Sequence, residues 1–460
     1  MDASIARDSA ARPDALAAGD AHTDSSTHVV GDAMRDAPER TLDAAPDSGA
    51  LGVVDASTMT GKVMYGYQGW FSAPADGSST NVFWHWAKAT GSPISASNVD
   101  VDLWPDTREL TAAELFATPL KMQDGGPANV FSAYTASTVA LHFAWMKTYG
   151  IDGVMLQRFP ADFTGAPFLA FRNSVTTNVM TAAEATGRVF SVMYDVTGMT
   201  ESTMVGVIES DWKMLVDTLH ITGSDRYLHH KGRPLVTLWG LGFSDRPGTP
   251  ADATALIDWF HTGAGAGYEA SVMGGVCSEW RTGTSDCSTA AGWAEVYAAF
   301  DVVSPWTVGR YTSTSGGAFS ATGADNWTTS TTVPDLAAAA SAGVDYAPVI
   351  WPGFSWKNEN GGPLNQIPRY GGQFYWRQAY DDIQAGATML YVAMFDEANE
   401  STAMFKVAEN ASQAPATGSF LTLDADGMAL PSDWYLRLGG ASAQMLRREI
   451  PLTSTIPISP

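Results

Sequence analysis

The sequence predicts an α/β protein built as a (β/α)8 TIM barrel with long loops on its catalytic face. Eight short runs of apolar or β-branched residues follow one another along the chain, and each is followed by room for a helix. The runs are nearly continuous in hydrophobicity, as strands buried on both faces are. A doubly wound open sheet is the main alternative, but no G-x-G-x-x-G pattern follows the first run.

The eight expected strands and the clearest helices can be given by range. The strands are VMYGY (63–67), GVMLQRF (153–159), VFSVMYDV (189–196), PLVTLWG (234–240), ASVMGGV (270–276), DVVSPW (301–306), DYAPVIW (345–351) and MLYVAMFD (389–396). Helical patterns occupy 137–150, 209–220, 251–261 and 375–386, and the first and last end at a glycine, the usual C-cap residue. The long intervals from 68 to about 136 and from 307 to 333 are expected to be loops on the catalytic face.

Residues 1–55 differ in composition from the rest of the chain. Their first fifty positions hold no Phe, Trp or Tyr and are rich in Ala and Asp. Such a stretch buries too little apolar surface to offset the entropy of ordering, so we expect a disordered linker before one catalytic domain at 56–460. It lacks the apolar core of a signal peptide and resembles the spacer behind a cleaved export signal, with or without a lipid anchor.

Charge and composition exclude some classes of function. The 460 residues carry a formal net charge of -23, and such a surface repels nucleic acid, which needs Lys and Arg to neutralise its phosphates. No stretch approaches the ~20 uninterrupted apolar residues of a transmembrane helix. We expect a monomer that acts on an uncharged partner.

Two cysteines, Cys277 and Cys287, lie in the polar stretch VCSEWRTGTSDCST. Their closeness favours a disulfide that closes a loop, and disulfides persist outside the cytoplasm. Two unrelated free thiols are the alternative. No pattern of nearby histidines suggests zinc or another metal. The sequence therefore predicts an extracytoplasmic protein, either secreted, periplasmic or held at the surface as a lipoprotein.

Aromatic and polar residues gather at the ends of the expected strands, where a barrel of this kind has its active site. These residues are Tyr67, Gln68, Gln157, Arg158, Tyr194, Asp195, Trp239, Trp306, Arg310, Trp351 and Asp396. Flat rings stack on the C–H faces of sugars and polar groups bind hydroxyls, so the set indicates a carbohydrate site. Taken singly, a Trp can be a core residue, Asp195 a helix cap, and Arg158 the partner of a structural carboxylate.

Glu397 and Glu400 follow the last expected strand in FDEANEST. On a helical turn, residues three apart share a face. Two nearby carboxylates repel, which raises one pKa and supplies the acid and the base that glycoside cleavage requires. The alternative is a solvated acidic helix start, where carboxylates favour the helix dipole.

Several motifs resemble glycoside hydrolase family 99, the endo-α-mannosidases and endo-α-mannanases. FDEANEST is similar to that family's N-E-W-H-E-G-T segment, with Glu397 and Glu400 on its two glutamates. VMYGYQGWF, which contains Tyr65, and NVFWHWA, which contains His85 and Trp86, resemble its first strand and its W-x-H-W loop. YGIDGVMLQRF, YAPVIWPGF and GGQFYWRQAYDDI resemble further segments in the same order. Family 71, the α-1,3-glucanases, shares the general layout.

The resemblance implies a (β/α)8 barrel and a retaining mechanism through a 1,2-anhydro sugar. Carried over, Glu397 is the base toward the sugar's 2-hydroxyl and Glu400 is the general acid/base, with no metal or cofactor. The sequence departs from the motif beside the pair: Asp396 stands in place of Asn, Ala398 and Asn399 replace Trp and His, and Ser401 replaces Gly.

The leading hypothesis is a retaining glycoside hydrolase that cleaves α-linked oligosaccharides or polysaccharides, with α-mannan as the first candidate. An α-1,3-glucanase-like enzyme is one alternative, and a non-catalytic glycan-binding surface protein on a degenerate barrel is another. A third, in which the acids bind a metal, lacks the histidines that such sites usually contain.

Overall fold

The structure, a computed structural model, describes residues 52–263, 265 and 267–460. The linker expected at 1–55 therefore lies outside the described residues except for its last positions. There the amide of Val54 donates to the carbonyl of Gly187 at 2.9 Å, and Arg226 donates to the carbonyl of Val54 at 2.9 Å. The chain is thus already attached to the barrel at residue 54.

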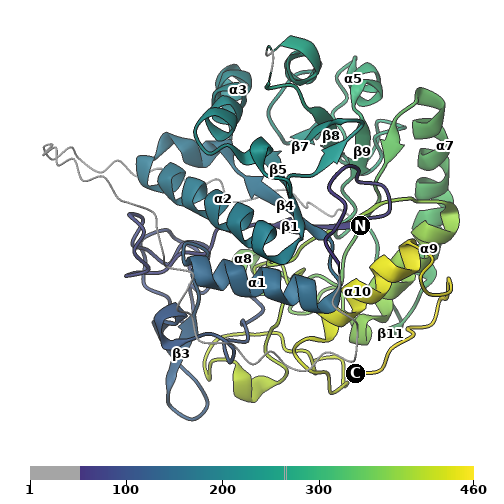
Figure 1. The fold of residues 1–460 in the computed structure, drawn as a ribbon. Coiled ribbons are helices and arrows are strands. Elements are labelled where there is room, and N and C mark those ends of the chain that lie inside the picture. The colour runs from purple at the N-terminus through teal and green to yellow at the C-terminus, as the bar shows by residue number, and fades with distance from the viewer. Residues whose placement is uncertain (1–51, 264, 266) are drawn as a thin grey trace, which may run out of the picture.

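Parallel strands form the central sheet, curled inside a layer of helices (Figure 1). The strands are β1 (Val63–Tyr67), β4 (Gly153–Arg158), β5 (Val189–Asp195), β7 (Arg233–Leu241), β8 (Ser271–Val276), β9 (Val302–Pro305), β12 (Asp345–Tyr346), β13 (Val349–Ile350) and β14 (Leu390–Val392). Every one of the eight sequence runs forms a strand, and the central strands are buried over almost their whole length. The TIM-barrel prediction is confirmed.

The ring closes through the seventh run, 345–350, which is divided into β12 and β13. β12 pairs with β9 on one side, and β13 pairs with β14 on the other. β14 in turn pairs in parallel with β1. Pro348, between the two halves, has no N–H to donate, so the ladder changes partner there. The carbonyl of Pro348 still accepts the amide of Tyr391 at 3.0 Å, which keeps the ring continuous.

The helices alternate with the strands. They are α1 (Ala136–Tyr149), α2 (Ala166–Thr186), α3 (Glu201–Asp217), α4 (Pro250–Asp258), α5 (Trp293–Ala299), α6 (Thr322–Trp327), α7 (Val333–Ala342), α9 (Gln373–Ala385) and α10 (Trp434–Leu446). The C-caps Gly150 and Gly386 take the left-handed conformation, with φ of 79° and 109°. Only glycine adopts that conformation without steric cost, which explains why both helices end there.

Shorter elements lie in the connections. They are β2 (Phe116–Lys121), β3 (Pro127–Val130), β6 (His229–His230), β10 (Thr314–Ser315), β11 (Ala318–Phe319), α8 (Lys357–Asn360), the 3-10 turns η1 (Ala112–Glu114), η2 (Pro160–Thr164), η3 (Ile221–Gly223), η6 (Tyr370–Gly372) and η7 (Ala411–Gln413), and the π-helical segments η4 (Trp259–Gly263) and η5 (Thr328–Thr332).

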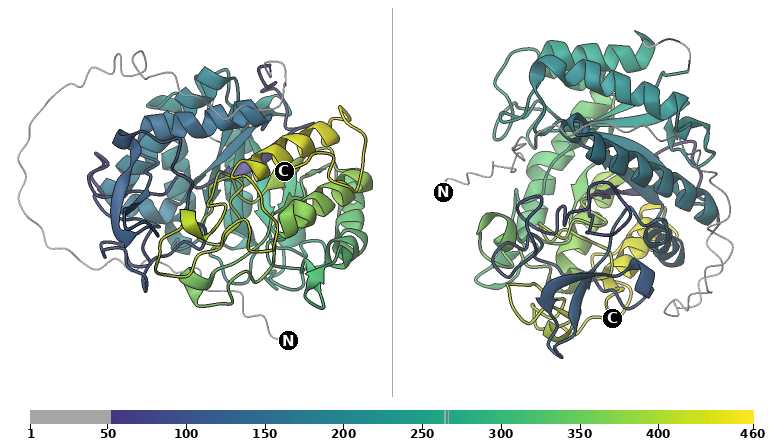
Figure 2. Two further views of the ribbon diagram at one scale, coloured as in Figure 1. Left: turned by 90° about the horizontal axis from the view of Figure 1, so that it is seen from below. Right: turned by 90° about the vertical axis from the view of Figure 1, so that its left-hand side faces the viewer.

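The interval 68–136 is a long loop that contains the hairpin of β2 and β3. It packs beside the segment that follows β14, as both views of Figure 2 show. Backbone bridges join Leu103 to Leu421, Pro105 to Val407 and Met122 to Pro415. The loops after the first and the last strand therefore form one layer.

The interval 307–333 is only partly a loop, which corrects the sequence expectation. Its first half carries the short hairpin of β10 and β11, but α6 and η5 run without a break into α7 in the outer layer. The Thr-rich stretch TTSTT is a weak helix former in isolation. It is helical here because Thr331 and Thr332 are buried in the packing of η5 against α9.

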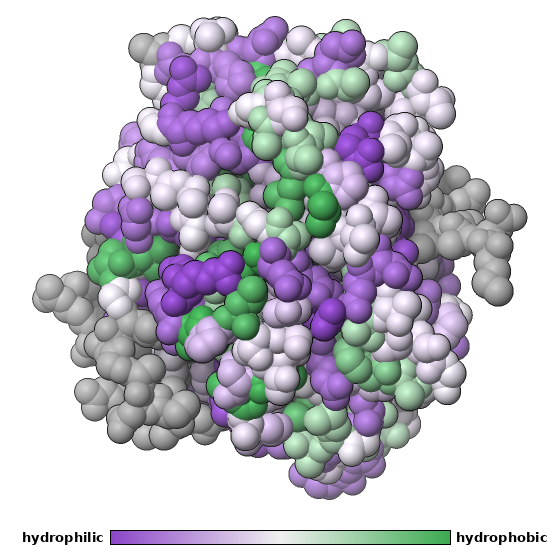
Figure 3. Space-filling model, turned by 90° about the vertical axis from the view of Figure 1, so that its right-hand side faces the viewer, coloured by the Kyte–Doolittle hydropathy of each residue, from purple (hydrophilic) through white to green (hydrophobic). Residues whose placement is uncertain are grey.

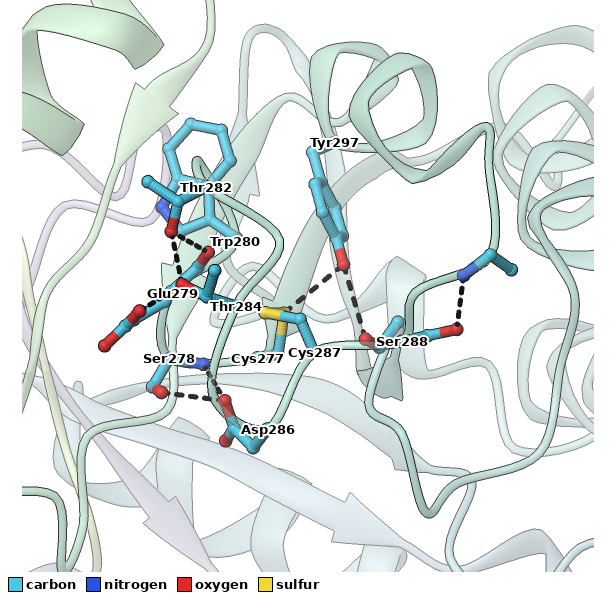
Figure 4. The surroundings of a disulfide bond; sticks show 12 residues. Cys277, Ser278, Glu279, Trp280, Thr282, Thr284, Asp286, Cys287, Ser288 and Tyr297 are labelled. Atoms are coloured by element: carbon cyan, nitrogen blue, oxygen red, sulfur yellow. Dashed lines mark hydrogen bonds between the residues drawn. A yellow bond between two sulfur atoms is a disulfide. The ribbon is translucent and has the colours of Figure 1, made fainter.

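Cys277 and Cys287 form a disulfide at the end of β8 (Figure 4). Within the loop, Asp286 accepts the amide and the hydroxyl of Ser278 at 2.9 and 2.7 Å. The amide of Ser288 donates to the carbonyl of Gly242 at 2.8 Å, which ties the disulfide loop to the loop after β7.

Most of the face drawn in Figure 3 is polar. On the face drawn in Figure 3, apolar side chains form small patches separated by polar ones. The large hydrophobic side chains that stand exposed in the described parts of the chain are Val53, Val333 and Leu364. Among the helices that the structure describes, none has the length and apolar content needed to cross a membrane.

Candidate active site

Glu397 and Glu400 lie on a tight turn that follows β14. After the turn, the chain folds back beside the residues that precede it. The amide of Ala403 donates to the carbonyl of Glu397 at 2.9 Å, and the amide of Phe405 donates to the carbonyl of Phe395 at 2.9 Å. Ser401 has a left-handed φ of 58°. The expected helical turn is therefore wrong, as is the alternative of an acidic helix start, because residues 398–401 form a turn without helix.

Glu397 is the buried member of the pair, with 4% of its surface exposed, whereas Glu400 is partly exposed. Gln68 Nε2 donates to Glu397 Oε2, and the other oxygen, Oε1, has no hydrogen-bond partner. Burial raises the pKa of Glu397 well above its ordinary value, and the charges of Glu400, Glu359 and Asp396 raise it further. The two glutamates thus interact electrostatically despite the absence of a helix.

Both carboxylate oxygens of Asp396 bind the backbone of the loop after β1. Its Oδ1 accepts the amide of Gln68 at 2.7 Å, and its Oδ2 accepts the amide of Gly69 at 2.9 Å. Burial raises its pKa to about 6, although both amides favour the ionised form. Asp396 thereby fixes the first residues of the loop after β1.

Arg172, which the sequence analysis missed, holds the same loop from the other side. Its Nη1 donates to the carbonyl of Gln68 at 2.9 Å, and its Nη2 forms an ion pair with Asp162 at 2.8 Å. The guanidinium lies between the rings of Trp84 and Phe159, at 4.9 and 5.0 Å from their centroids. Gln68 is therefore fixed through its amide, its carbonyl and its side chain.

Side chains alternate between the two faces of a strand, and this divides the expected site residues. Tyr67 faces α1, where its hydroxyl lies 2.8 Å from His142 Nδ1. Arg158 and Tyr194 both face α3 and bind Asp211, at 2.5 Å from Arg158 Nη2 and 2.8 Å from the tyrosine hydroxyl. These three side chains point into the helix layer, where partners within the protein occupy them.

Tyr65, Trp86 and Trp351 are also core residues. The hydroxyl of Tyr65 lies 3.4 Å from that of Tyr375 in α9. Trp86 donates to the carbonyl of Phe131 at 3.0 Å and has no exposed surface. Trp351 also has no exposed surface, and its ring packs edge-on against Phe374 at 4.8 Å. All three belong to the hydrophobic core of the described residues.

Gln157, Asp195 and Glu397 gather around the hydroxyl of Tyr391, another residue that the sequence analysis missed. Tyr391 lies inside the barrel, where its hydroxyl contacts Met394 Sδ at 3.4 Å. Burial raises its pKa, and Asp195, Asp396 and Glu397 add to the rise, whereas a hydrogen bond with Gln157 lowers it. The structure thus brings these polar residues together at one end of the barrel.

Trp239 and Trp306 form the aromatic part of this rim. Their rings meet edge-on at 5.3 Å, and the indole N–H of Trp239 has no partner. Arg310 follows Trp306 and pairs with Asp286 of the disulfide loop. Its charge is therefore already neutralised by a neighbour.

His85 lies on the loop that contacts the acid turn. Its ring stacks on Trp70, with 3.7 Å between centroids, and its carbonyl accepts Asn399 Nδ2 at 3.1 Å. Burial and the charge of Arg172 lower the pKa of His85 well below its ordinary value, so its ring is neutral near pH 7. Trp70 was missed, although it stands two residues after Gln68.

Several buried polar atoms at the rim have no partner within the protein. They are Gln68 Oε1, Gln157 Oε1, Glu397 Oε1, Trp70 Nε1 and Trp239 Nε1. Buried polar groups are almost always hydrogen-bonded, so a set of unpaired ones at one place indicates a site for a polar ligand. In the described part of the chain, the one cluster with metal-ligand spacing is Cys277, Asp286 and Cys287, and both of its sulfurs are in the disulfide.

Comparisons with known proteins identify relatives only by fold. No family model matches the sequence, and no curated protein matches it significantly. The GH99 endo-alpha-mannosidase from Bacteroides thetaiotaomicron, alone and in complex with Bis-Tris propane, superimposes with a TM-score of 0.58 over 85% of this chain and 99% of that one. A glycoside hydrolase-like protein gives a TM-score of 0.49 over 76% of this chain and 97% of that one. Both are 14% identical in sequence. The likeness to the endo-alpha-mannosidase therefore concerns architecture, and this chain has the same (β/α)8 fold.

Proposed function

We propose that this protein is a retaining glycoside hydrolase that cleaves α-linked oligosaccharides or polysaccharides. The observation that carries the proposal is the pair of glutamates at the barrel rim, in which burial and then the charge of Glu400 raise the pKa of Glu397. A carboxyl pair that holds one proton near neutral pH supplies the acid and the base of glycoside cleavage.

The location of that proton depends on the ligand. In the free protein, burial and the charge of Glu400 raise the pKa of Glu397, which favours the protonated form of that carboxyl. A sugar hydroxyl that donates to the unpaired Oε1, together with Gln68 on Oε2, stabilises the ionised form of Glu397. A glycosidic oxygen beside Glu400 is an acceptor and favours a protonated Glu400. Substrate binding thus selects the protonation state that the reaction needs.

From that state the reaction is balanced in protons. Glu397 takes the proton of the 2-hydroxyl, whose oxygen attacks the anomeric carbon, while Glu400 protonates the departing oxygen. The product of this step is a 1,2-anhydro sugar. Glu400 then takes a proton from water, whose oxygen opens the strained ring at the anomeric carbon, and Glu397 returns its proton to the 2-oxygen. Two inversions at the anomeric carbon give net retention.

The rest of the rim fits a carbohydrate. Trp239 and Trp306 offer apolar ring surfaces, and the amide oxygens of Gln68 and Gln157 are unpaired acceptors for hydroxyl donors. An α-mannan-like substrate is proposed, because a family 99 enzyme is a structural neighbour. In an α-mannoside the 2-hydroxyl is trans to the leaving oxygen, as back-side attack by that hydroxyl requires. In an α-1,3-glucan it is cis, so cleavage of that glycan would need a different route.

The test is a screen of the purified protein against α-mannans, α-1,3-glucans and other α-linked polysaccharides, with release of reducing ends as the readout. On any substrate that is cleaved, Glu397→Gln and Glu400→Gln should each lower turnover by at least ~100-fold. Glu449→Gln, which alters an exposed glutamate paired with Arg447, is the control and should keep full activity. Binding of a glycan without turnover would instead identify a glycan-binding protein.

We also propose that the protein acts outside the cytoplasm, as a secreted, periplasmic or surface-anchored enzyme. The disulfide between Cys277 and Cys287 supports this, since such bonds persist in oxidising compartments. Fractionation of the native cells tests it, and recovery of the protein in the cytoplasmic fraction with free thiols would contradict it.

A further inference from the structure

Asp102 lies in the long loop between β1 and α1 and has no exposed surface. Its Oδ2 accepts the hydroxyl of Ser355 at 2.5 Å and the amide of Lys357 at 2.7 Å. Its Oδ1 accepts the amide of Asn358 at 2.7 Å. A buried carboxylate is costly unless its acceptors are satisfied, and here three donors, all from the segment after β13, satisfy them.

The backbone beside Asp102 binds the acid turn directly. The amides of Asp102 and Leu103 both donate to the carbonyl of Ala398, at 3.0 and 3.1 Å. Ala398 is the residue after Glu397. At the other end of the turn, the amide of Ser355 donates to the carbonyl of Glu400 at 2.9 Å. Ser355 is the residue whose hydroxyl Asp102 holds, so Asp102 is linked to both ends of the turn.

We propose that Asp102 is a positioning residue that sets the separation of Glu397 and Glu400. It does so by holding Ala398 through its backbone and Glu400 through Ser355. Its importance for catalysis rests on the function proposed above, but its effect on the two carboxyls does not depend on any substrate.

Asp102 also places a third carboxylate near the pair. The amides that it accepts, those of Lys357 and Asn358, belong to α8, which carries Glu359. The charged groups that act on Glu397 are Glu400, Glu359 and Asp396, and the amide of Gln68 bonds to it. Asp102 itself faces the charge of Lys88. A shift of the Asp102 loop would therefore move two of the three charges that act on Glu397.

Two variants and a matched control separate this role from a general loss of packing. In Asp102→Asn, one oxygen becomes an NH2 group that faces an amide N–H, so at least one of the three bonds is lost. Ser355→Ala removes the hydroxyl link between Asp102 and the acid turn, together with the acceptor for the amide of Asn365. Asp106→Asn changes a largely buried acid four residues further along the same loop, whose side chain binds Arg108 instead of the turn.

The experiment is an NMR pH titration of the glutamate side-chain carboxyl carbons in ¹³C-labelled protein. The signals of Glu397 and Glu400 are assigned by their absence in Glu397→Gln and Glu400→Gln. When the turn relaxes, the repulsion between the pair weakens. The titration midpoint of Glu397 should therefore fall by about one pH unit in Asp102→Asn and by less in Ser355→Ala. It should stay at the wild-type value in Asp106→Asn.

A Glu397 midpoint that is unchanged or raised in folded Asp102→Asn overturns the proposal, because a merely structural residue lowers the melting temperature without moving that midpoint. If Asp102→Asn fails to fold, Ser355→Ala decides the matter by the same criterion. Since no substrate is added, the result stands even if the protein proves to cleave no glycan. On a cleaved glycan, Asp102→Asn should in addition lower kcat by roughly tenfold with little change in KM.

Discussion

Glu397 and Glu400 differ in their surroundings, and this difference allows their roles to be separated by kinetics. Glu400 is proposed to protonate the leaving oxygen, which an activated aryl glycoside hardly needs. Glu400→Gln should therefore slow cleavage of an aryl α-glycoside much less than that of a natural glycan, with at least a ~10-fold difference between the two losses. Glu397→Gln should slow both alike, since the 2-hydroxyl then lacks its base. The reverse pattern would exchange the two assignments.

Gln68 provides a second test at the level of a single residue. Its Nε2 bonds to Glu397 Oε2 and favours the ionised carboxylate. In Gln68→Met this donor is absent, so the pKa of Glu397 should rise further, and the acidic limb of the kcat/KM profile should move to higher pH. Activity at pH 6 should fall by at least ~10-fold. Gln157→Met removes an amide that bonds to Tyr391 instead, so it should leave the acidic limb in place.

Adjacent residues at a strand end show what the sequence could and could not predict about the site. Gln157 and Arg158 are neighbours, as are Tyr194 and Asp195, and both pairs were expected at the rim. A strand points successive side chains to opposite faces, so only Gln157 and Asp195 reach the interior. The sequence shows that a strand end is polar. Which of its side chains point to the barrel interior and which to the helices depends on the register of the strands in the closed ring.

At the level of elements, a buried carboxyl in α9 should make the stability of the protein depend on pH. Asp382 of α9 is buried, and burial followed by the charge of Asp381 raises its pKa to about 8. The pKa of Asp382 in the unfolded state is near 3.8, so between the two pKa values the folded state binds more protons than the unfolded state. The free energy of unfolding therefore falls as the pH rises toward 8. Asp382→Asn cannot ionise. Its melting temperature relative to wild type should be higher at pH 9 than at pH 5, by at least ~2 °C.

The control for this measurement is Asp258→Asn on α4, a carboxyl at the helix surface beside open solvent. Its effect on the melting temperature should be the same at both pH values. An equal effect of Asp382→Asn at pH 5 and pH 9 would show that Asp382 is ionised in the folded protein throughout, contrary to its raised pKa.

The strands could be predicted from the sequence where burial inside the barrel determines their hydrophobic pattern. β1, β4 and β5 appear as nearly continuous apolar runs because both of their faces are buried. The turn at 398–401 was mistaken for a helix because acidic residues at a spacing of three fit both. The turn is fixed by the bond between the amide of Phe405 and the carbonyl of Phe395. These residues are ten apart, so no local sequence pattern indicates their contact.

For the molecule as a whole, the order and number of the strands could be derived from the sequence, but the arrangement of the loops could not. The loop of 68–136 is fixed by partners hundreds of residues away, such as Leu421 for Leu103 and Ser355 for Asp102. Such contacts are set by tertiary packing and leave no periodicity in the sequence. The same contacts hold the acid turn, so the candidate site is a product of the whole fold.

The divided strand at 345–350 gives the barrel an unequal resistance to local opening. β12 and β13 each register with one neighbour over two residue pairs, whereas β4 and β5 register over six. Local openings start where few hydrogen bonds must break together. In native-state hydrogen exchange, the amides of Ala347 and Tyr391, which bond across this seam, should exchange at least ~10-fold faster than those between β4 and β5. Equal protection would mean that the ring opens only as a whole.

Because β14 borders the seam and leads into the acid turn, a local opening there would admit solvent beneath Glu397 and Glu400 while the opposite wall of the barrel stays closed.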